Sequence, residues 1–321
     1  MALDNRQLGE ISAMTIDYRI PDLIDNFFTS NPLIIKLLQR DKVEVDGGEK
    51  IRQPVIYGKL NGGSYTDLDL FNTDRKETVA DMIFEWKQKY VNITISGLEG
   101  LKNAGAAKIR DQANYKMDNA SMTGADLLGT AIYGDGTADG GKDITGLRAA
   151  LDDGTTYTTY GGITRSSTTG TEGAAVRGNI DTTGGVFSLG FMNTKWSAAI
   201  VANEKPDLIV TTQTIWNKWW DRVQPSQRFN ATSSGNQMAN AGFDVIRHNG
   251  ADVVVDQHCP AGHVYFLNTK WIKFITHTKR QWSFTGWKYP TNQDSMIGQL
   301  LWAGELVVQS PRLQSMVTNV T

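Results

Sequence analysis

The stretch VIYGKLNGGSYTDLD, Val55–Asp69, separates two classes of protein. A phosphate-binding loop has the pattern GxxxxGK[ST] or GxGxxG, with the N-terminus of a helix behind its glycines. Here Lys59 precedes Gly62 and Gly63. The residues after the glycines alternate between polar and apolar and begin no helical period. The stretch therefore argues against a nucleotide site.

The same stretch is typical of a β-hairpin, which we expect from about Glu49 to Phe71. Asn-Gly supplies the positive φ that a tight turn needs. Pro54 cannot donate a ladder hydrogen bond, so the first strand should lie at an edge. Because an isolated hairpin is marginal in water, this one should pack on its own domain or on another chain. We predict that its tip contacts another subunit through Lys59, Asn61, Gly62, Gly63, Ser64 and Tyr65.

Composition limits the class of protein. The 321 residues are 40% hydrophobic, so a sizeable core can form, and the net charge of −2 gives no basic surplus for nucleic acid. The single Cys259 excludes an internal disulfide framework and fits a reducing cytoplasm. No apolar stretch approaches the roughly 20 residues of a membrane span. The polar N-terminus is not a signal peptide, and we expect no membrane partner.

The N-terminal half predicts an arm, a strand and a helix. Pro32 at the first turn favours a short helix over 31–38. Period-two hydrophobicity begins at Met82, and its parity switches after Tyr90, which predicts one long strand with a bulge or a change of covered face. Ser96 and Glu99 form a capping box, with Ser96 as the N-cap of a long helix. The expected apolar stripe of this helix is Leu98, Leu101, Ile109, Ala113, Met117 and Leu127.

The C-terminal half begins with residues 134–184, which are rich in Gly, Thr and Ser and read as loops. Alternating strand and helix patterns over about 185–265 predict a small α/β unit. The tail returns to strands, expected at 264–267, 271–274, 299–308 and 313–317.

No motif for catalysis was found. The sequence has no GxSxG and no HExxH. His258, Cys259 and His263 could meet around zinc, but Cys-Pro-Ala-Gly is turn chemistry between two strands, and no second ligand pair of zinc spacing occurs. Two pairs of acids, Asp67/Asp69 and Asp152/Asp153, could be the catalytic carboxylates of a glycosidase. Neighbouring acids in turns are normally solvated, however, so we expect these pairs to be exposed to water. We predict no enzyme, no catalytic, cofactor-binding or metal-binding residue, and no cofactor.

Three motifs and the order of the parts carry a family resemblance. The motifs are Tyr160–Ser166 after Gly146-Leu147, then Pro206–Thr211 before a Trp-rich helix, and Pro260–Asn268. With the arm, hairpin, long strand and capped helix, the chain resembles the major capsid protein of tailed bacteriophages. The resemblance implies the α+β Hong Kong 97-type fold. One departure is that 168–179 contain no tryptophan, whereas relatives often carry one soon after the first motif.

The resemblance also implies a domain plan. Its parts are an N-terminal arm (1–44), an extended (E) loop hairpin (45–80), a peripheral (P) domain with a long strand and spine helix (81–145), a Gly/Thr/Ser-rich connecting loop (146–184), an axial (A) domain (185–265) and return strands of the P domain (266–321). Gly161, Gly162 and Arg165 would form a structural loop motif.

The implied function is self-assembly, as pentamers and hexamers, into an icosahedral virion capsid around double-stranded DNA, in the host cytoplasm. The implied partners are other copies, a portal, a possible decoration protein and, because the arm starts at Met1, a separate scaffold protein. Some relatives cross-link a hairpin lysine to a neighbour's asparagine with a buried glutamate as catalyst. Here Lys59 lies near the tip, the other two residues cannot be placed, and we expect Lys59 to be a charge at a subunit contact. The alternatives are a portal- or tail-associated virion component and a glycosidase-like soluble enzyme.

Overall fold

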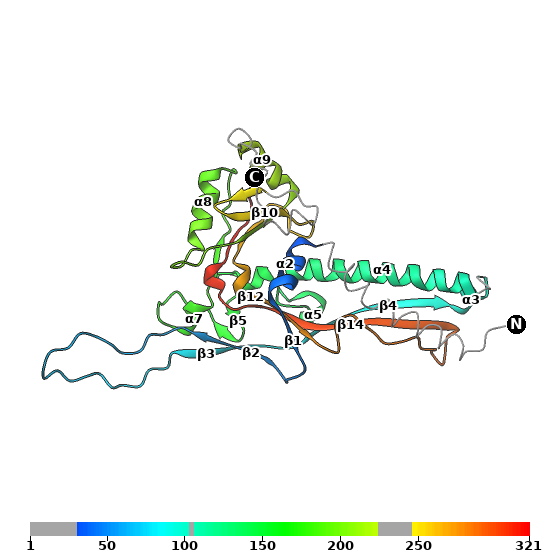
Figure 1. Ribbon diagram of the computed structural model, residues 1–321, viewed down its shortest axis with the longest axis horizontal. Helices are drawn as coiled ribbons and strands as arrows, with labels where there is room; N and C mark the ends of the chain where they lie inside the picture. Colours follow the sequence, from blue (N-terminus) through cyan, green and yellow to red (C-terminus); the bar gives the residue numbers. More distant parts are fainter. Residues whose placement is uncertain (1–30, 103–105, 224–245) are drawn as a thin grey trace.

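The computed structural model describes residues 31–102, 106–223 and 246–321. Figure 1 shows an elongated molecule with a thin arm at one end, a long helix over long strands at the other, and a smaller α/β unit above their junction. The first part of the predicted N-terminal arm, residues 1–30, lies outside the described residues.

The long sheet is built around β14 (Ser295–Val308). Residues 295–304 of β14 pair antiparallel with β4 (Lys87–Ser96), and residues 304–308 pair antiparallel with β12 (Ile272–His277). β1 (Lys42–Val45) adds parallel to β12, and β13 (Ser283–Phe284) pairs with the middle of β14. The predicted strand 299–308 is therefore present and begins earlier than expected.

A long helix covers one face of this sheet, but the predicted capping box begins the short helix that precedes it. α3 (Gly97–Lys102) follows β4 directly, and α4 (Ala106–Ile132) runs back along the sheet (Figure 1). The expected apolar stripe was correct at Met117 and wrong at Leu98 and Leu127, which are exposed. The buried side chains described in α4 include Met117, the alanines Ala120, Ala125 and Ala131, and Leu128, which takes the place expected for Leu127.

The upper sheet has six strands in the order β7-β15-β11-β8-β10-β9. Its strands are β7 (Asn179–Asp181), β8 (Leu208–Thr211), β9 (Ile246–His248), β10 (Ala251–Val255), β11 (Val264–Leu267) and β15 (Ser315–Val317). α8 (Leu189–Ala198) and α9 (Gln213–Val223) supply apolar residues to its second hydrophobic cluster. β15 pairs with β11 and β7, so this tail strand belongs to the upper sheet and not to the long sheet where we expected the return strands.

The hairpin exists with a different second strand and a different bend. β2 (Ile51–Ile56) pairs only with β3 (Val79–Phe84) among the described strands, with Ile51 opposite Phe84 and Ile56 opposite Val79. Residues 57–78 form a long loop instead of a tight Asn-Gly turn. Gly62 and Gly63 do not have positive φ. The predicted turn at these glycines was therefore wrong.

The predicted single long strand is two strands. β3 and β4 are separated at Glu85-Trp86, and the parity of buried residues changes there. Met82 and Phe84 are buried before the break, and Val91 is buried after it. The change of face therefore occurs at the break and not after Tyr90, which is itself exposed.

The shorter elements complete the junction. α2 (Pro32–Asp41) is the predicted short helix, and the side chain of Asn31 caps it. Residues 146–184, expected to be loops, contain short regular elements: α6 (Leu147–Ala150), β5 (Thr159–Tyr160), β6 (Ile163–Thr164), α7 (Glu172–Ala175) and β7. The remaining ones are α5 (Ala138–Gly141), η2 (Thr269–Trp271) and η3 (Pro311–Leu313).

Candidate assembly interface

The hairpin and its loop, residues 51–84, are called the arm from here on and are distinct from the N-terminal arm. This arm exposes large apolar side chains along the loop at its end. The exposed fractions of Leu60, Tyr65, Leu68, Leu70 and Phe71 run from 67% to 100%. All residues from 62 to 77 are exposed, and the loop projects away from the body (Figure 1). Soluble monomers rarely gather so many exposed apolar groups, which mark interaction sites.

The loop has internal order at its tip. The bend lies at Thr66 to Asp69, where the Asp69 N–H donates to the Thr66 carbonyl at 2.9 Å. In return the Asp69 carboxylate accepts from the Thr66 N–H and hydroxyl, both at 2.8 Å, and these hydrogen bonds lower the pKa of Asp69, the backbone one most. Across the loop, Asn61 Nδ2 donates to Asn72 Oδ1 at 3.2 Å. The tip is thus a defined shape that a partner can recognise.

The predicted loop motif holds the root of the arm. Gly161 and Gly162 have φ of 56° and 78°, the left-handed pair that a two-residue hairpin between β5 and β6 requires. The Gly161 carbonyl accepts from the Ile83 N–H of β3 at 2.8 Å. The ring of Tyr160 contacts Phe84 of β3 edge-on, with centroids 5.2 Å apart. This hairpin therefore touches the arm where it leaves the body.

Arg165, which follows β6 directly, holds the β5–β6 hairpin to the neighbouring segments of the body. The side chain is buried, and its guanidinium donates to four backbone carbonyls at 2.7 to 3.0 Å; these belong to Ala149, Ala150, Tyr157 and Val176. One residue thus ties α6, the segment before β5 and the end of α7 together. Five N–H donors on a rigid plane suit arginine to this task, and a lysine would not match it.

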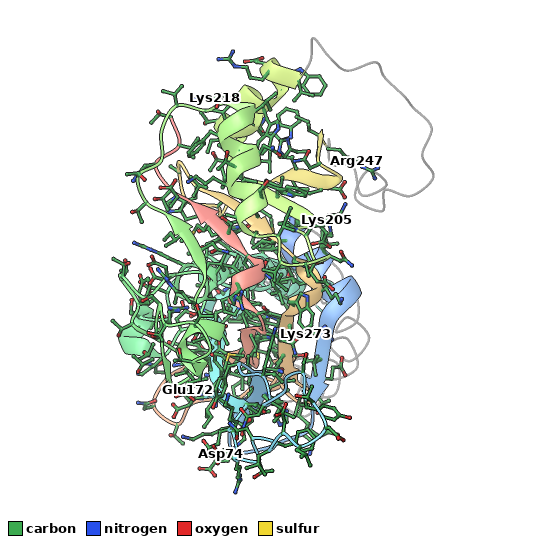
Figure 2. All side chains as sticks on the ribbon, turned by 90° about the vertical axis from the view of Figure 1, so that its left-hand side faces the viewer. Asp74, Glu172, Lys205, Lys218, Arg247 and Lys273 are labelled. Carbon is green, nitrogen blue, oxygen red and sulfur yellow. The ribbon has the colours of Figure 1, made fainter. Side chains whose placement is uncertain are left out.

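A groove of about 1090 Å³ lies at the arm's root. Lys59, Lys76 and Arg312 line it, together with Glu77 and residues around α7. α7 contacts β2 of the arm. Figure 2, which views the arm end-on, places Asp74 of the arm below Glu172 of α7. Lys59, predicted at the hairpin tip, therefore lies nearer the root, because the loop continues well beyond it.

Structural comparison gives matches over nearly the whole chain. The capsid of cyanophage A-1(L) matches with a TM-score of 0.68 at 17% identity, over 92% of this chain and 94% of that one. The capsid of a native GTA particle gives 0.58 at 10% identity, over 92% and 91%. The SrpI encapsulin of Synechococcus elongatus gives 0.57 at 9% identity, over 91% and 89%. The chain has the fold of phage capsid proteins.

By sequence, no family model and no curated protein matches this chain. The capsid fold, an α+β fold, is thus recognised through its structure. Two of these structures are described as capsids and the third as an encapsulin complex, and at 17% identity or less they establish the fold alone. None of the described helices is both long and apolar enough to span a membrane.

The predicted helix cap lies at the far end of the capsid fold. The Ser96 N–H donates to Glu99 Oε2 at 3.3 Å, which is the reciprocal half of a capping box. Glu99 Oε2 also accepts from Lys116 Nζ of α4 at 2.9 Å. The cap therefore joins the turn after β4 to the long helix as well as starting α3.

The residues considered for zinc have other roles. Cys259 is buried, its Sγ lies 3.7 Å from the His263 carbonyl, and burial raises the pKa of its thiol. His258 points instead to the carboxylates of Asp126 and Asp256. Across the described ranges, no three or more His, Cys, Asp or Glu side chains group as metal ligands.

The acid pairs behave differently from each other. Asp67 and Asp69 are exposed, as expected. Asp152 was expected to be solvated and is buried instead. Its Oδ1 accepts backbone N–H groups of the following turn, the closest from Gly154 at 2.7 Å. It is an internal acceptor for that turn.

Sequence reasoning missed Glu305. It lies in β14 and is buried, with Oε1 accepting from Thr145 N at 2.7 Å and from Leu306 N at 3.1 Å. Its Oε2 has no hydrogen-bond partner within the described structure. Burial raises the pKa of this carboxyl to about 8 against the effect of those hydrogen bonds. The available signal was a single acid inside the apolar run LLWAGELVV.

Proposed function

We propose that this chain is the major capsid protein of a tailed phage, and that it self-assembles as pentamers and hexamers into an icosahedral shell around double-stranded DNA. The exposed apolar arm carries the proposal. In this Hong Kong 97-type reading the arm is the E loop, β4, β14 and α4 form the P domain, and the upper sheet is the core of the A domain. The role is structural, in a virion capsid assembled in the host cytoplasm.

The energetics favour a lattice over a dimer. Covering one large apolar side chain contributes about 1.5–3 kcal/mol, so covering the five on the arm contributes about 7.5–15 kcal/mol. Association costs an estimated 4–15 kcal/mol in lost freedom. One arm alone therefore gives little surplus. A head-to-tail contact repeated around a closed ring gives every subunit two such contacts and leaves no open end.

The charge of the chain fits many copies packed together. A net charge of −2 per subunit limits repulsion between neighbours. It also fits a shell that encloses DNA without binding it in a sequence-specific way. A scaffold protein, a portal and a decoration protein would be its partners during and after assembly.

Electron microscopy of the purified full-length protein tests the proposal. We expect closed shells tens of nanometres across, in the range that repeated copies of a 35.4 kDa subunit form. Rings or tubes would favour a portal- or tail-associated component. A stable monomer on a sizing column would sink the shell assignment. Shells from infected cells that lack nuclease-protected DNA would overturn the genome-enclosing role alone.

The arm itself is tested by shortening it. The Tyr57 N–H donates to the Thr78 carbonyl at 2.9 Å, so the ladder closes at this pair. Replacing residues 58–77 by Asn-Gly should leave a folded hairpin. We expect this variant to unfold at nearly the wild-type temperature and to form no closed shells. Normal shells from it would refute the arm's role.

A further inference from the structure

His258 lies where three elements meet: the turn after β10, α4, and the residue that caps α2. Its Nε2 is 3.0 Å from Asp126 Oδ1 on α4. Its Nδ1 is 3.4 Å from two different atoms, Asp256 Oδ1 and Asn31 Nδ2. Only 8% of the His258 side chain is exposed and Asp256 is fully buried, so the Nδ1 side of the ring is shielded from water, whereas Asp126 on the Nε2 side is 73% exposed.

The two neighbours of Nδ1 require opposite states of the ring. Asp256 Oδ1 accepts hydrogen bonds, so Nδ1 must carry a proton to bond to it. The amide group of Asn31 donates, so Nδ1 must then be unprotonated. The Asn31 amide is oriented by its other end, because its Oδ1 accepts the Ile34 N–H at 3.4 Å as the cap of α2. Nδ1 can therefore serve one neighbour at a time.

The surroundings favour the charged ring. Asp256 is buried; its Oδ2 accepts from the hydroxyl of Tyr133, the residue after α4, at 2.9 Å, and its Oδ1 accepts from the His258 backbone N–H. The bond to Asp256 raises the pKa of His258 against the cost of burial, and Asp126 adds to the rise. The titratable groups around the ring are Asp126 of α4, Tyr133 directly after α4, and Asp256 and Cys259 of its own turn. The residue that faces the ring from the start of α2 is the uncharged N-cap Asn31.

We propose that His258 is a proton-dependent selector between two connections within the subunit. When the ring is protonated, it donates to Asp126 and Asp256 and ties the turn of the upper sheet to α4. When the ring is neutral, Nε2–H still donates to Asp126, and Nδ1 accepts from Asn31 and so supports the cap of α2. This inference stands on the fold and does not rest on the proposed function.

The direction with pH follows from linkage. A histidine whose pKa is raised by folding stabilises the fold below its ordinary pKa of about 6.5, and the stabilisation is lost as pH rises through the folded value. The interaction of the protonated His258 ring with Asp256 is therefore strongest at mildly acidic pH. The hydrogen bond from Asn31, the cap of α2, to His258 Nδ1 becomes more populated over the same pH range in which the interaction with Asp256 weakens.

Hydrogen exchange of the full-length protein, corrected for the intrinsic pH dependence, tests both ends of the selector. In wild type we expect protection of the Ile34 and Ile35 amides to rise about threefold to tenfold between mildly acidic and mildly alkaline pH, the equivalent of one hydrogen bond. In His258→Gln, which cannot take up a proton, we expect no such rise. Equal pH dependence in both proteins would overturn the proposal.

Asp126→Asn tests whether protonation of His258 causes the transition. The substitution should not destabilise the fold, because the Asp126 side chain is 73% exposed. Removing this charge should move the exchange transition to lower pH while the unfolding temperature at alkaline pH stays that of wild type. A transition at unchanged pH would show that another group titrates, and the selector would be wrong. The other histidines are the same in all three proteins, so their titration cancels.

Discussion

The amide of Ile83 in the arm donates to the carbonyl of Gly161 at 2.8 Å. This bond joins the arm to a hairpin that follows it by many residues in the chain. A Cβ on Gly161 would lie only 2.7 Å from the Cβ of Met82. The arm therefore leaves the body at a place where a residue without a side chain lets two backbones approach. The direction of the arm depends on that approach.

Gly161→Ala should loosen the root of the arm. The new methyl group meets Met82, and the φ of 56° is unfavourable for alanine, which together cost about 2–4 kcal/mol. We expect a lower unfolding temperature and faster proteolysis within 57–78. Gly162→Ala is the matched control, because its φ is also positive but its Cβ would meet open space. Equal losses in both variants would show that the close approach contributes nothing.

Arg165→Lys should destabilise the subunit although it conserves the charge. Lysine can satisfy at most three of the four carbonyls that the guanidinium now reaches, and not in one plane. Each charge-assisted hydrogen bond lost costs about 1.5–3 kcal/mol. Denaturant unfolding should give a midpoint well below that of wild type. A midpoint within error of wild type would mean that water replaces these bonds at no cost.

The double substitution Leu68→Ser with Leu70→Ser should weaken assembly without weakening the fold. Both side chains are more than nine-tenths exposed, so removing them takes no contact from the subunit. If a neighbour covers them, each loss costs about 1.5–3 kcal/mol per contact. We expect the protein concentration needed for shell formation, followed by light scattering, to rise at least tenfold.

Val186→Ser is the matched control for that experiment. Val186 is 78% exposed and precedes Phe187, whose N–H donates to the carbonyl of Thr321 at the C-terminus, in the upper unit and away from the arm (Figure 1). It should assemble at the wild-type concentration if the arm is the apolar contact. An equal rise for Val186→Ser would mean that surface hydrophobicity in general drives assembly.

The sequence was sufficient where the signal was local. A few adjacent residues predicted the start of a helix in two places, at Asn31-Pro32 and at the Ser96–Glu99 capping box. The alternating residues of the hairpin also predicted strands, but an alternating segment forms a strand only where another part of the protein packs against its apolar face. At Tyr65, Leu68 and Leu70 no part of the chain that the structure describes provides such cover, and these residues form the exposed loop.

The sequence was insufficient where distant segments meet. Two strands read as one across Glu85-Trp86, because both have period two and only the packing shows the change of face. The position of β15 in the upper sheet follows from pairing with β11 and β7, which no local pattern encodes. His258 and Asp126 are 132 residues apart, and their meeting depends on the whole fold.

Glu305→Gln should remove a pH dependence of stability. A folded pKa of about 8, above the ordinary 4.5, means that the folded state holds a proton that the unfolded state has released. Stability should therefore fall as pH rises from about 4.5 to 8, with a limiting slope of about 1.4 kcal/mol per pH unit. Glutamine keeps Oε1 as the acceptor for Thr145 and Leu306 and cannot ionise.

The unfolding temperatures of Glu305→Gln and wild type should accordingly be similar near pH 5 and diverge towards pH 8, with the variant the more stable. Asp143→Asn is the control, because that acid helps to raise the pKa of Glu305 from outside the β14 strand. Removing its charge should lower the folded pKa of Glu305, so that the fall in stability ends at a lower pH and is smaller in total. A constant difference between Glu305→Gln and wild type at all pH values would mean that Glu305 is ionised in the fold, and that a hydrogen-bond donor reaches Oε2 from outside the described residues.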